Sequence, residues 1–531
     1  MLIRPDPCHP CFYPQFLNLP KNTSVKTILL FGAGKSATVL IDYLIAEAEK
    51  SNWKFVIADA NKEQVLAKTN HSAFAEAVQL DIKDDKHRGA LIEAADIVIS
   101  MMPPDLHFLV AKDCVEYGKH LLTASYLDDK IKSLQTEIQN KKLLFLCEMG
   151  LDPGIDHMSA MKIIDTIRSK GGTITSFKSH CGGLVAPESD DNPWHYKISW
   201  NPRNIVMAGK AGAVYKMNGH IVKENYEELF EVDRGVKTDA GIGFLSYYPN
   251  RDSLPYMDVY GLQDADTFMR TTLRYPDFMY GWNNIIELKL TDETPAYDTD
   301  GMSIAAFFKE HLAKVNFGDW LKGKLEERLA FVQDLTEKIN KLMEAQEEMK
   351  EAKKEDPAIE TVKDFSVVDE EGNLQQIDVE QMKDRAAYAI AHKMHEANQT
   401  LKQLFFLGMD DENTIINKGH CSAADVLQFT LEKKLALSPA DKDMIVMLHE
   451  FEYSIDDKKE TLNSSLVVKG EDALRTAMAK TVGLPLGIAA KLILNGTIKL
   501  TGLHIPTAKE IYMPVLEELE AAGICFLESR G

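Results

Sequence analysis

Short apolar runs alternate with helix-like patterns through the first 150 residues. The runs are rich in Ile, Leu and Val and do not alternate with polar residues, which is typical of strands buried on both faces of a parallel sheet. The expected strands are residues 28–31, 55–58, 77–81, 95–103, 119–125 and 143–147. Because helical patterns separate them, the sequence predicts an α/β fold with a Rossmann-type doubly wound parallel sheet.

The periodicity changes after residue 150. A helical pattern over residues 154–167 is followed by segments that alternate with period two. The expected strands of this part are residues 173–181, 206–215, 285–290, 443–455 and 461–469. They predict an antiparallel sheet with helices on one face, the usual form of a substrate domain.

Residues 307–437 follow a helical pattern. Within them, Val332, Leu335, Ile339 and Leu342 recur at spacings of three and four, which predicts a coiled-coil seam on a charged helical arm near 320–356. Residues 365–374 indicate a turn or small hairpin. Near the end of the chain, residues 473–482 and an apolar helix over 488–495 are expected as separate segments.

Composition narrows the class of protein. The chain has 531 residues and a formal net charge of -21, which argues against a nucleic-acid or membrane partner because either would need a basic face. No apolar run of membrane-spanning length is expected. The 7 cysteines do not form a disulfide framework, so a reducing, cytoplasmic location is expected. Residues 1–23, which include Cys8 and Cys11, are interpreted as a disordered leader without a signal peptide.

A glycine-rich turn follows the first expected strand. Residues 32–37 read Gly-Ala-Gly-Lys-Ser-Ala and precede a helical pattern, as in turns that bind a dinucleotide. Gly32 would permit the tight turn, Gly34 would let the backbone approach a pyrophosphate, and Ala37 would let helix and strand pack closely. Asp59 ends the second strand, where an acid can accept hydrogen bonds from the ribose. Because its carboxylate would repel a 2′-phosphate, the sequence favours NAD over NADP.

Polar clusters follow several expected strands. Residues 148–157 combine acids, glycines and a histidine, and Asp152 is the acid that no capping role explains. Cys181 precedes two glycines but has no evident base beside it, and no metal site is expected. Arg270 and Arg274, with Arg251 in a nearby turn, are of the type that captures substrate carboxylates.

These clusters carry a family resemblance. Gly-Leu-Asp-Pro-Gly-Ile-Asp-His at 150–157, Cys-Gly-Gly-Leu at 181–184 and Tyr-Pro-Asn-Arg-Asp-Ser at 248–253 resemble saccharopine dehydrogenase of the L-glutamate-forming type. Thr-Leu-Arg-Tyr at 272–275 and Ala-Met-Ala-Lys-Thr-Val-Gly at 477–483 strengthen the resemblance, as does Leu-Glu-Lys-Lys at 431–434. The similar blocks are spread over about residues 25–530, and the stretch near 320–400 lacks an evident counterpart.

The resemblance implies a homodimeric oxidoreductase of lysine metabolism that acts on a CH-NH donor. It would interconvert saccharopine with L-glutamate and 2-aminoadipate 6-semialdehyde, with NAD or NADP as cofactor. It also implies that the C-terminal segment returns to the cofactor domain, beside a mixed α/β substrate and dimerisation domain with a helical insertion. The expected parts are a leader at 1–23, a Rossmann domain of 24–150 with 478–531, a substrate domain of 151–306 with 438–477, and a helical domain at 307–437.

Residue roles carried over by position form two sets. The cofactor set, with the two glycines of the turn, is Gly32, Gly34, Lys35, Ser36, Ala37, Asp59, Ala60, Asn61, Leu80, Asp81, Met101, Thr123, Ala124, Gly150, Leu151 and Asp152. The substrate set is Ser125, Tyr126, Arg251, Thr272, Leu273 and Arg274. Imine reduction needs a general acid or base, and Asp152, Tyr126 and Cys181 are the candidates.

One position departs from the family pattern. Where NADP-using relatives have an arginine after the second strand, this chain has Ala60 beside Asp59, so a NAD-linked, catabolic role is open. Two other functions also stay open. One is another imine reductase, such as an enzyme making a carboxylated polyamine of the carboxynorspermidine type. The other is a catalytically silent nucleotide sensor or scaffold that uses the helical arm.

Overall fold

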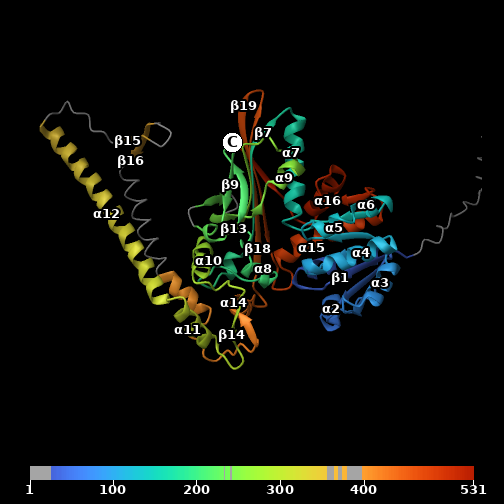
Figure 1. The fold of residues 1–531 in the computed structure, drawn as a ribbon. Helices are drawn as coiled ribbons and strands as arrows, with labels where there is room; N and C mark the ends of the chain where they lie inside the picture. The colour runs from blue at the N-terminus through green and yellow to red at the C-terminus, as the bar shows by residue number, and fades with distance from the viewer. Residues whose placement is uncertain (1–24, 232–233, 239–241, 356–363, 369–373, 379–397) are drawn as a thin grey trace, which may run out of the picture.

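The computed structural model describes residues 25–231, 234–238, 242–355, 364–368, 374–378 and 398–531. The expected leader at 1–23 lies outside these residues. Figure 1 shows a Rossmann-like part, a central sheet of long strands, and the helix α12 (Phe317–Glu355), which runs apart from both. The predicted helical arm therefore coincides with α12.

The Rossmann-like part is built on a parallel sheet. In spatial order its strands are β20 (Gly502–His504), β6 (Leu144–Leu146), β5 (His120–Thr123), β4 (Ile97–Ser100), β1 (Thr27–Phe31), β2 (Lys54–Asp59) and β3 (Ala75–Gln79). Ile28, Leu30 and Phe31 of β1 are fully buried because helices cover both faces of the sheet. The predicted doubly wound parallel sheet is confirmed.

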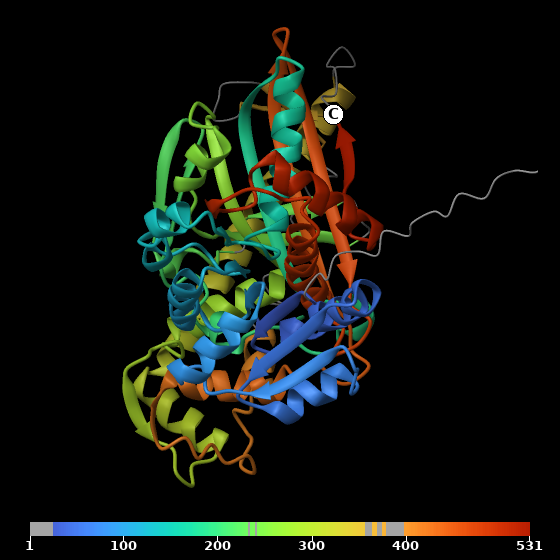
Figure 2. The ribbon, with the colours of Figure 1, turned by 90° about the vertical axis from the view of Figure 1, so that its right-hand side faces the viewer.

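Helices from both ends of the chain cover this sheet. They are α1 (Thr38–Ser51), α2 (Lys62–Thr69), α3 (Asp85–Ala94), α4 (His107–Tyr117), α5 (Asp129–Lys132), α6 (Gln135–Asn140), α15 (Ala477–Leu494) and α16 (Lys509–Ala521). Helix α15 packs on α1, and Figure 2 shows the red C-terminal helices beside the blue N-terminal segments. The end of the chain thus completes the part with which it begins.

The central sheet is mixed. Its main path is β10 (Gly235–Thr238), β11 (Gly243–Pro249), β13 (Thr267–Arg274), β7 (Thr173–Val185), β18 (Asp443–Ile455), β19 (Lys458–Lys469) and β21 (Leu527–Arg530), with β8 (Ala213–Met217), β9 (His220–Glu224) and β12 (Arg251–Asp252) at the side. Most pairs are antiparallel, but β7 and β13 run parallel, with Cys181 opposite Thr272. Helices α7 (Ile155–Ser169) and α9 (Pro255–Tyr260) belong to this part. Residues 478–531 were predicted to belong to the Rossmann domain, but β21 pairs with β19, so residues 527–530 belong to the central sheet instead.

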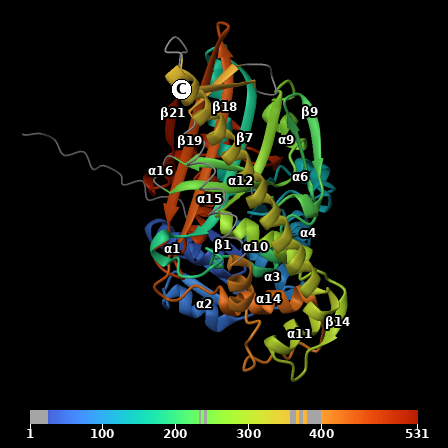
Figure 3. The same ribbon diagram turned by 90° about the vertical axis from the view of Figure 1, so that its left-hand side faces the viewer.

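The remaining elements pack around a separate core that includes Trp194, Trp282 and Phe307. They are α8 (Pro202–Val206), η4 (Tyr226–Glu228), α10 (Pro276–Glu287), α11 (Ile304–Lys314), α14 (Ala423–Lys434), β14 (Pro295–Asp298) and β17 (His420–Ser422). The other short turns are η1 (Lys35–Ala37), η2 (Pro104–Leu106) and η3 (Pro187–Ser189). Figure 3 shows α11 and α14 together at the foot of α12. The expected hairpin is formed by β15 (Asp364–Val368) and β16 (Leu374–Asp378).

Three expectations about local structure are wrong. Residues 285–290 are the end of α10 and the turn after it. Ile285 and Ile286 are buried because α10 packs against the separate core. Residues 206–215 contain the end of α8 and the start of β8 rather than one strand. The last segments form one helix, α15, which continues through Pro485.

Helix α15 also corrects the expectation about apolar runs. Residues Ala477–Leu494 are long and apolar enough to cross a membrane by length and composition, with a mean hydropathy of 1.5. In the structure 78% of this window is buried inside the protein, between α1, α16 and the sheets. The helix is therefore a core helix in this fold.

Candidate active site

The glycine-rich turn joins β1 to η1 and α1. Gly32 has φ +94, and a Cβ there would lie 2.9 Å from the carbonyl oxygen of Met101. Gly34 is exposed, and a Cβ there would meet no heavy atom within 4 Å. The space over Gly34 at the start of the helix is thus open to a dinucleotide pyrophosphate, so the turn fits the predicted cofactor.

Asp59 lies beside this turn. Its carboxylate accepts hydrogen bonds from the backbone N–H groups of Ala33 at 2.7 Å and Asn61 at 2.9 Å. The Lys68 ammonium donates to the Gly34 carbonyl oxygen at 2.5 Å, and burial lowers the pKa of Lys68 to about 8. The acid predicted to bind the ribose is therefore held in place next to the pyrophosphate turn.

The two glycines should respond differently to alanine. Gly32→Ala is expected to cost about 1–3 kcal/mol of stability, because it combines a positive φ with a backbone clash. Gly34→Ala is expected to keep the melting temperature of the parent and still lose about tenfold or more in cofactor affinity, since its methyl group would occupy the pyrophosphate's approach. Calorimetry and fluorescence titration with NADH and NADPH measure the two effects. Equal melting temperatures for the two variants would contradict the assignment.

The other predicted cofactor residues follow the same edge of the sheet. Lys35, Ser36 and Ala37 form η1, Ala60 is exposed after β2, and Asn61 caps α2. Leu80 is buried after β3, and Asp81 beside it is exposed. Met101 follows β4, Thr123 ends β5 and Ala124 follows it, whereas Gly150 and Leu151 lie in the loop before α7. The predicted set is thus brought to the carboxyl ends of the parallel strands, where ligands of such sheets bind.

His107 was missed by sequence analysis. It begins α4 and is 3% exposed. One ring nitrogen lies 2.8 Å from the Ser100 hydroxyl and the other lies 2.7 Å from the Ser125 hydroxyl. Burial lowers the pKa of His107 to about 4, so the ring is neutral at pH 7 and holds Ser125 by hydrogen bonding. The cluster of hydroxyl residues at the strand ends was the available sequence signal.

Acid is expected to destabilise the fold through His107 and His449. Burial lowers both pKa values to about 4, whereas a histidine in the unfolded chain titrates near 6.5. Below about pH 6.5 the unfolded chain therefore binds more protons, and the free energy of unfolding falls by about 1.4 kcal/mol per pH unit for each ring down to about pH 4. Thermal unfolding between pH 7 and 5 measures this slope. It should flatten in His449→Gln but not in His220→Gln, which changes an exposed ring; parallel slopes in all three proteins would refute the prediction.

The loop before α7 is tied to the central sheet by Arg270. This arginine is 4% exposed, and its guanidinium donates to Asp152 at 2.5 Å and to Asp156 at 2.8 Å. It also lies 4.4 Å from the centre of the Tyr256 ring. Arg270 is thus already neutralised by two carboxylates and acts as a structural clamp.

The two carboxylates that share Arg270 differ in proton affinity. Burial raises the pKa of Asp152 above its usual range, and the Arg270 charge offsets this only in part. Burial acts in the same direction on Asp156, but His157, Arg270 and a hydrogen bond from the Gly154 N–H outweigh it and lower its pKa. Asp152 is therefore the carboxylate suited to exchange a proton.

A second hydrogen-bonded group supports this loop from behind. Glu148 is 3% exposed and has φ +58. It accepts hydrogen bonds from His157 at 2.8 Å and from the Tyr256 hydroxyl at 3.2 Å. The other ring nitrogen of His157 shares a 2.5 Å hydrogen bond with Tyr260. This buried group fixes the start of α7, just after Asp152.

Tyr126 connects the two sides of the site. Its hydroxyl donates to Asp152 at 3.4 Å, and the Arg251 guanidinium lies 5.1 Å from the ring centre. Burial raises the pKa of Tyr126 well above its usual range, so the phenol keeps its proton. Arg251 is exposed, has φ +55, and has no ion-pair partner among the described residues.

The residues of β13 alternate between two environments. Arg270, Thr272 and Arg274 share one face of the strand, because side chains of a strand repeat with period two. Leu273 packs in a small apolar cluster on the other face, so only its backbone adjoins the predicted substrate residues. Thr272 is paired with Cys181 of β7. Burial raises the pKa of Cys181 well above its usual range, which makes its thiol a neutral lining group rather than a nucleophile.

Arg274 differs from Arg270 in its partners. It is 4% exposed, and its guanidinium lies over the rings of Tyr196 and Phe278 at 5.4 and 5.5 Å. One amino group donates to the Leu273 carbonyl oxygen, whereas the Nε–H is buried with no hydrogen-bond partner in the described part of the chain. No described carboxylate pairs with Arg274. A buried, uncompensated guanidinium is the group that would bind a substrate carboxylate.

Two known domain families match consecutive parts of the chain. Residues 150–524 match the family described as "Saccharopine dehydrogenase C-terminal domain". The chain belongs to the saccharopine dehydrogenase family. Residues 28–146 match a second description, "Saccharopine dehydrogenase NADP binding domain", which covers the turn and Asp59. The predicted family membership is therefore confirmed, and in this saccharopine dehydrogenase fold the two matches meet at the loop that holds Asp152.

Relatives of two lengths match the chain. It is 30% identical to alpha-aminoadipic semialdehyde synthase of Arabidopsis thaliana, over 96% of this chain and 45% of that protein. It is also 30% identical to saccharopine dehydrogenase [NADP(+), L-glutamate-forming] of Saccharomyces cerevisiae, over 93% of this chain and 97% of that protein. The chain therefore spans about half the length of the synthases that it matches and nearly all of the yeast protein.

A solved structure agrees with the fold. The apo histidine-tagged saccharopine dehydrogenase (L-Glu forming) of Saccharomyces cerevisiae matches with a TM-score of 0.73 and 27% identity, over 95% of this chain and 100% of that one. Among the described residues, no group of three or more His, Cys, Asp or Glu is arranged to hold a metal ion.

Proposed function

We propose that this chain interconverts saccharopine with L-glutamate and 2-aminoadipate 6-semialdehyde. The observation that carries the proposal is the pair of arginines without carboxylate partners, Arg251 and Arg274, in a site where Arg270 is already neutralised. A substrate with several carboxylates would supply the missing charges. The yeast relative, which is named as an L-glutamate-forming saccharopine dehydrogenase, supports the same conclusion.

The residues of the site have distinct roles in this proposal. Arg251 and Arg274 bind substrate carboxylates. Ser125, which His107 holds by a hydrogen bond, forms a hydrogen bond with the substrate. Bound NAD(P) supplies or accepts the hydride. Asp152 exchanges the proton that accompanies formation or hydrolysis of the imine, because its raised pKa keeps it close to the working pH. Tyr126 positions the substrate amine through its hydroxyl, and Cys181 lines the pocket.

We further propose that NAD is preferred to NADP. The Asp59 carboxylate is fixed by two backbone N–H groups beside the turn, and Ala60 supplies no positive charge for a 2′-phosphate. The family description that names NADP and the NADP(+)-linked relatives favour the other cofactor, and Lys68 is a nearby cation. Because these charges oppose one another, we expect both cofactors to be used, with a higher kcat/KM for NAD than for NADP.

The test is a spectrophotometric assay of the full chain with saccharopine at 340 nm, with NAD and NADP in parallel. Turnover with both and a higher kcat/KM for NAD supports both proposals. Turnover with NADP alone supports the reaction and rejects the cofactor preference. No turnover, together with tight NADH binding in a fluorescence titration, rejects saccharopine as substrate and directs the assay to a carboxylated polyamine. A homodimer is proposed on the family resemblance, and sedimentation velocity tests it.

A further inference from the structure

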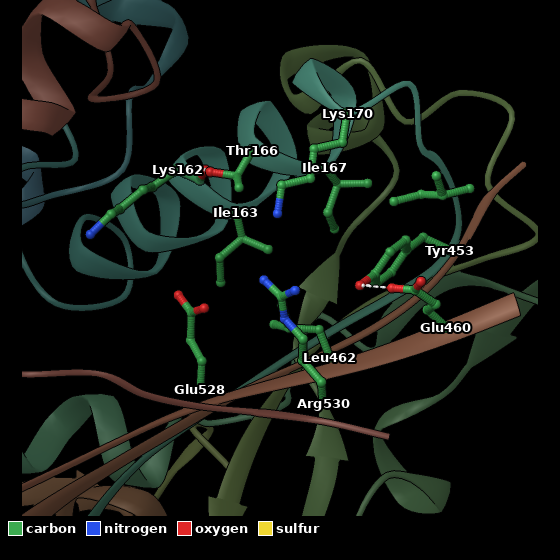
Figure 4. A pocket seen from close by; sticks show the side chains of 11 residues that line it. Lys162, Ile163, Thr166, Ile167, Lys170, Tyr453, Glu460, Leu462, Glu528 and Arg530 are labelled. Atoms are coloured by element: carbon green, nitrogen blue, oxygen red, sulfur yellow. Dashed lines mark hydrogen bonds between the residues drawn. The ribbon is translucent and has the colours of Figure 1, made fainter. Parts of the chain in front are cut away.

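A cavity lies away from the candidate active site. It has a volume of about 200 Å³ and is enclosed by the later turns of α7, the hairpin of β18 and β19, and the last strand β21. In Figure 4 Ile163 and Ile167 of α7 point toward the strands, and Glu528 and Arg530 of β21 point back toward the helix. None of its lining residues belongs to the predicted cofactor or substrate sets.

The floor of the cavity is apolar. Ile163 and Ile167 of α7 are 4% and 3% exposed, and Tyr453 and Leu462 of the hairpin are each 3% exposed. The polar atom of Tyr453 is already satisfied, because its hydroxyl donates to Glu460 at 2.7 Å. The floor therefore offers apolar contact and no unsatisfied polar group of its own.

The rim carries most of the charge. Lys162, Lys170 and Arg530 border the opening, and in the described part of the chain none of them forms an ion pair. Two acids also line the cavity, Glu460 and Glu528. Glu460 accepts the hydrogen bond of Tyr453, whereas Glu528 does not. In a protein with a net charge of -21, three cations without partners over an apolar floor make a local site for an anion with an apolar body.

We propose that this cavity binds a small carboxylic acid with an apolar body. Arg530 and Lys170 would hold the carboxylate, and the floor between α7 and the hairpin would hold the hydrocarbon. The volume is below the roughly 300–1,000 Å³ of pockets for drug-sized ligands, which fits a molecule of a few carbons. An α-amino acid would share this chemistry and would also use Glu528 for its ammonium group. The proposal does not depend on the proposed reaction.

The probes are hexanoate and two controls, titrated calorimetrically into the full chain. Hexanoate should bind saturably, whereas hexylamine, which has the same tail and the opposite charge, and acetate, which has no tail, should not. Arg530→Gln and Lys170→Gln should each weaken hexanoate about tenfold, the loss of one charge-assisted contact. Thr166→Trp, at an exposed rim position, should block the cavity. Lys309→Gln, on the exposed surface of α11, should change nothing.

The outcomes separate the sources of the ligand. L-norleucine, which is hexanoate with an α-ammonium group, should bind more tightly than hexanoate if the site takes amino acids, and Glu528→Gln should remove that advantage. Tighter binding of hexanoate instead assigns the site to simple carboxylic acids. The proposal is overturned if hexanoate does not bind, if hexylamine binds equally well, or if folded Arg530→Gln and Thr166→Trp proteins bind hexanoate as the parent does.

Discussion

Arg270→Met is expected to lower the free energy of unfolding by about 3–5 kcal/mol, because it leaves two buried carboxylates without their cation. Asp152 and Asp156 both contact the Arg270 guanidinium, and all three side chains are largely buried. The methionine would fill much of the volume of the arginine stem, so the loss reports on charge rather than on a cavity. Calorimetric melting, with denaturant unfolding alongside, measures the change.

A matched control exists in Arg203→Met. Arg203 also contacts two carboxylates, Asp425 at 3.0 Å and Glu293 at 2.7 Å, but its side chain is 33% exposed. Its loss should cost no more than about 1 kcal/mol, since water can solvate the freed charges. Adding Asp152→Asn to Arg270→Met should restore part of the stability by removing one buried charge. If both variants lost a similar free energy of unfolding, burial would not determine how much the ion pairs of Arg270 stabilise the protein.

Asp152→Asn is expected to reduce kcat for saccharopine oxidation by about 10²–10⁴-fold, the usual contribution of a general acid or base. Asparagine keeps the size of the side chain and can still accept from Arg270, so NADH affinity and the melting temperature should change little. Burial raises the pKa of Asp152, and the carboxylate is the form that accepts a proton. The acid limb of kcat/KM should therefore lie above the pH at which an exposed aspartate titrates, and rates should fall as pH decreases through it.

Tyr126→Phe serves as the comparison for this variant. It removes the hydroxyl that contacts Asp152 but leaves the carboxylate, so kcat should fall less than in Asp152→Asn, and the acid limb should persist. A kcat for Asp152→Asn within a few-fold of the parent would remove this residue from the chemistry. In that case Tyr126, or the amine of the substrate, would have to move the proton.

Local patterns predicted the cofactor part well. The apolar strands, the turn at Gly32 and the acid at Asp59 are each specified within a short window of sequence, and the structure brings them together. Residues 285–290 show the limit of the same reasoning. A short apolar run fits a strand or a helix, and here packing on the separate core selects the helix.

The partners of the arginines could not be predicted. Arg270 and Arg274 lie on one strand at the same periodicity, and nothing nearby in sequence distinguishes them. Arg270 is paired with residues more than a hundred positions earlier in the chain, whereas Arg274 lies over aromatic rings. His107 was missed for the same reason, because its role comes from the hydroxyls of Ser100 and Ser125, which lie on two different segments. Long-range contacts decide which of several equivalent residues is available to a substrate.

The position of β20 has a consequence for how the protein is made. This strand, at residues 502–504, pairs with β6 at the edge of the cofactor sheet, and α15 packs on α1 from the far end of the chain. During synthesis, the strands at residues 27–146 leave the ribosome long before these partners exist. Until then, the face of α1 that α15 covers and the edge of β6 that β20 pairs with are exposed. Chaperones bind such surfaces, and the surfaces promote aggregation. The cofactor part can be completed only after residues 502–504 have been made, because its closing contacts join segments far apart in the sequence.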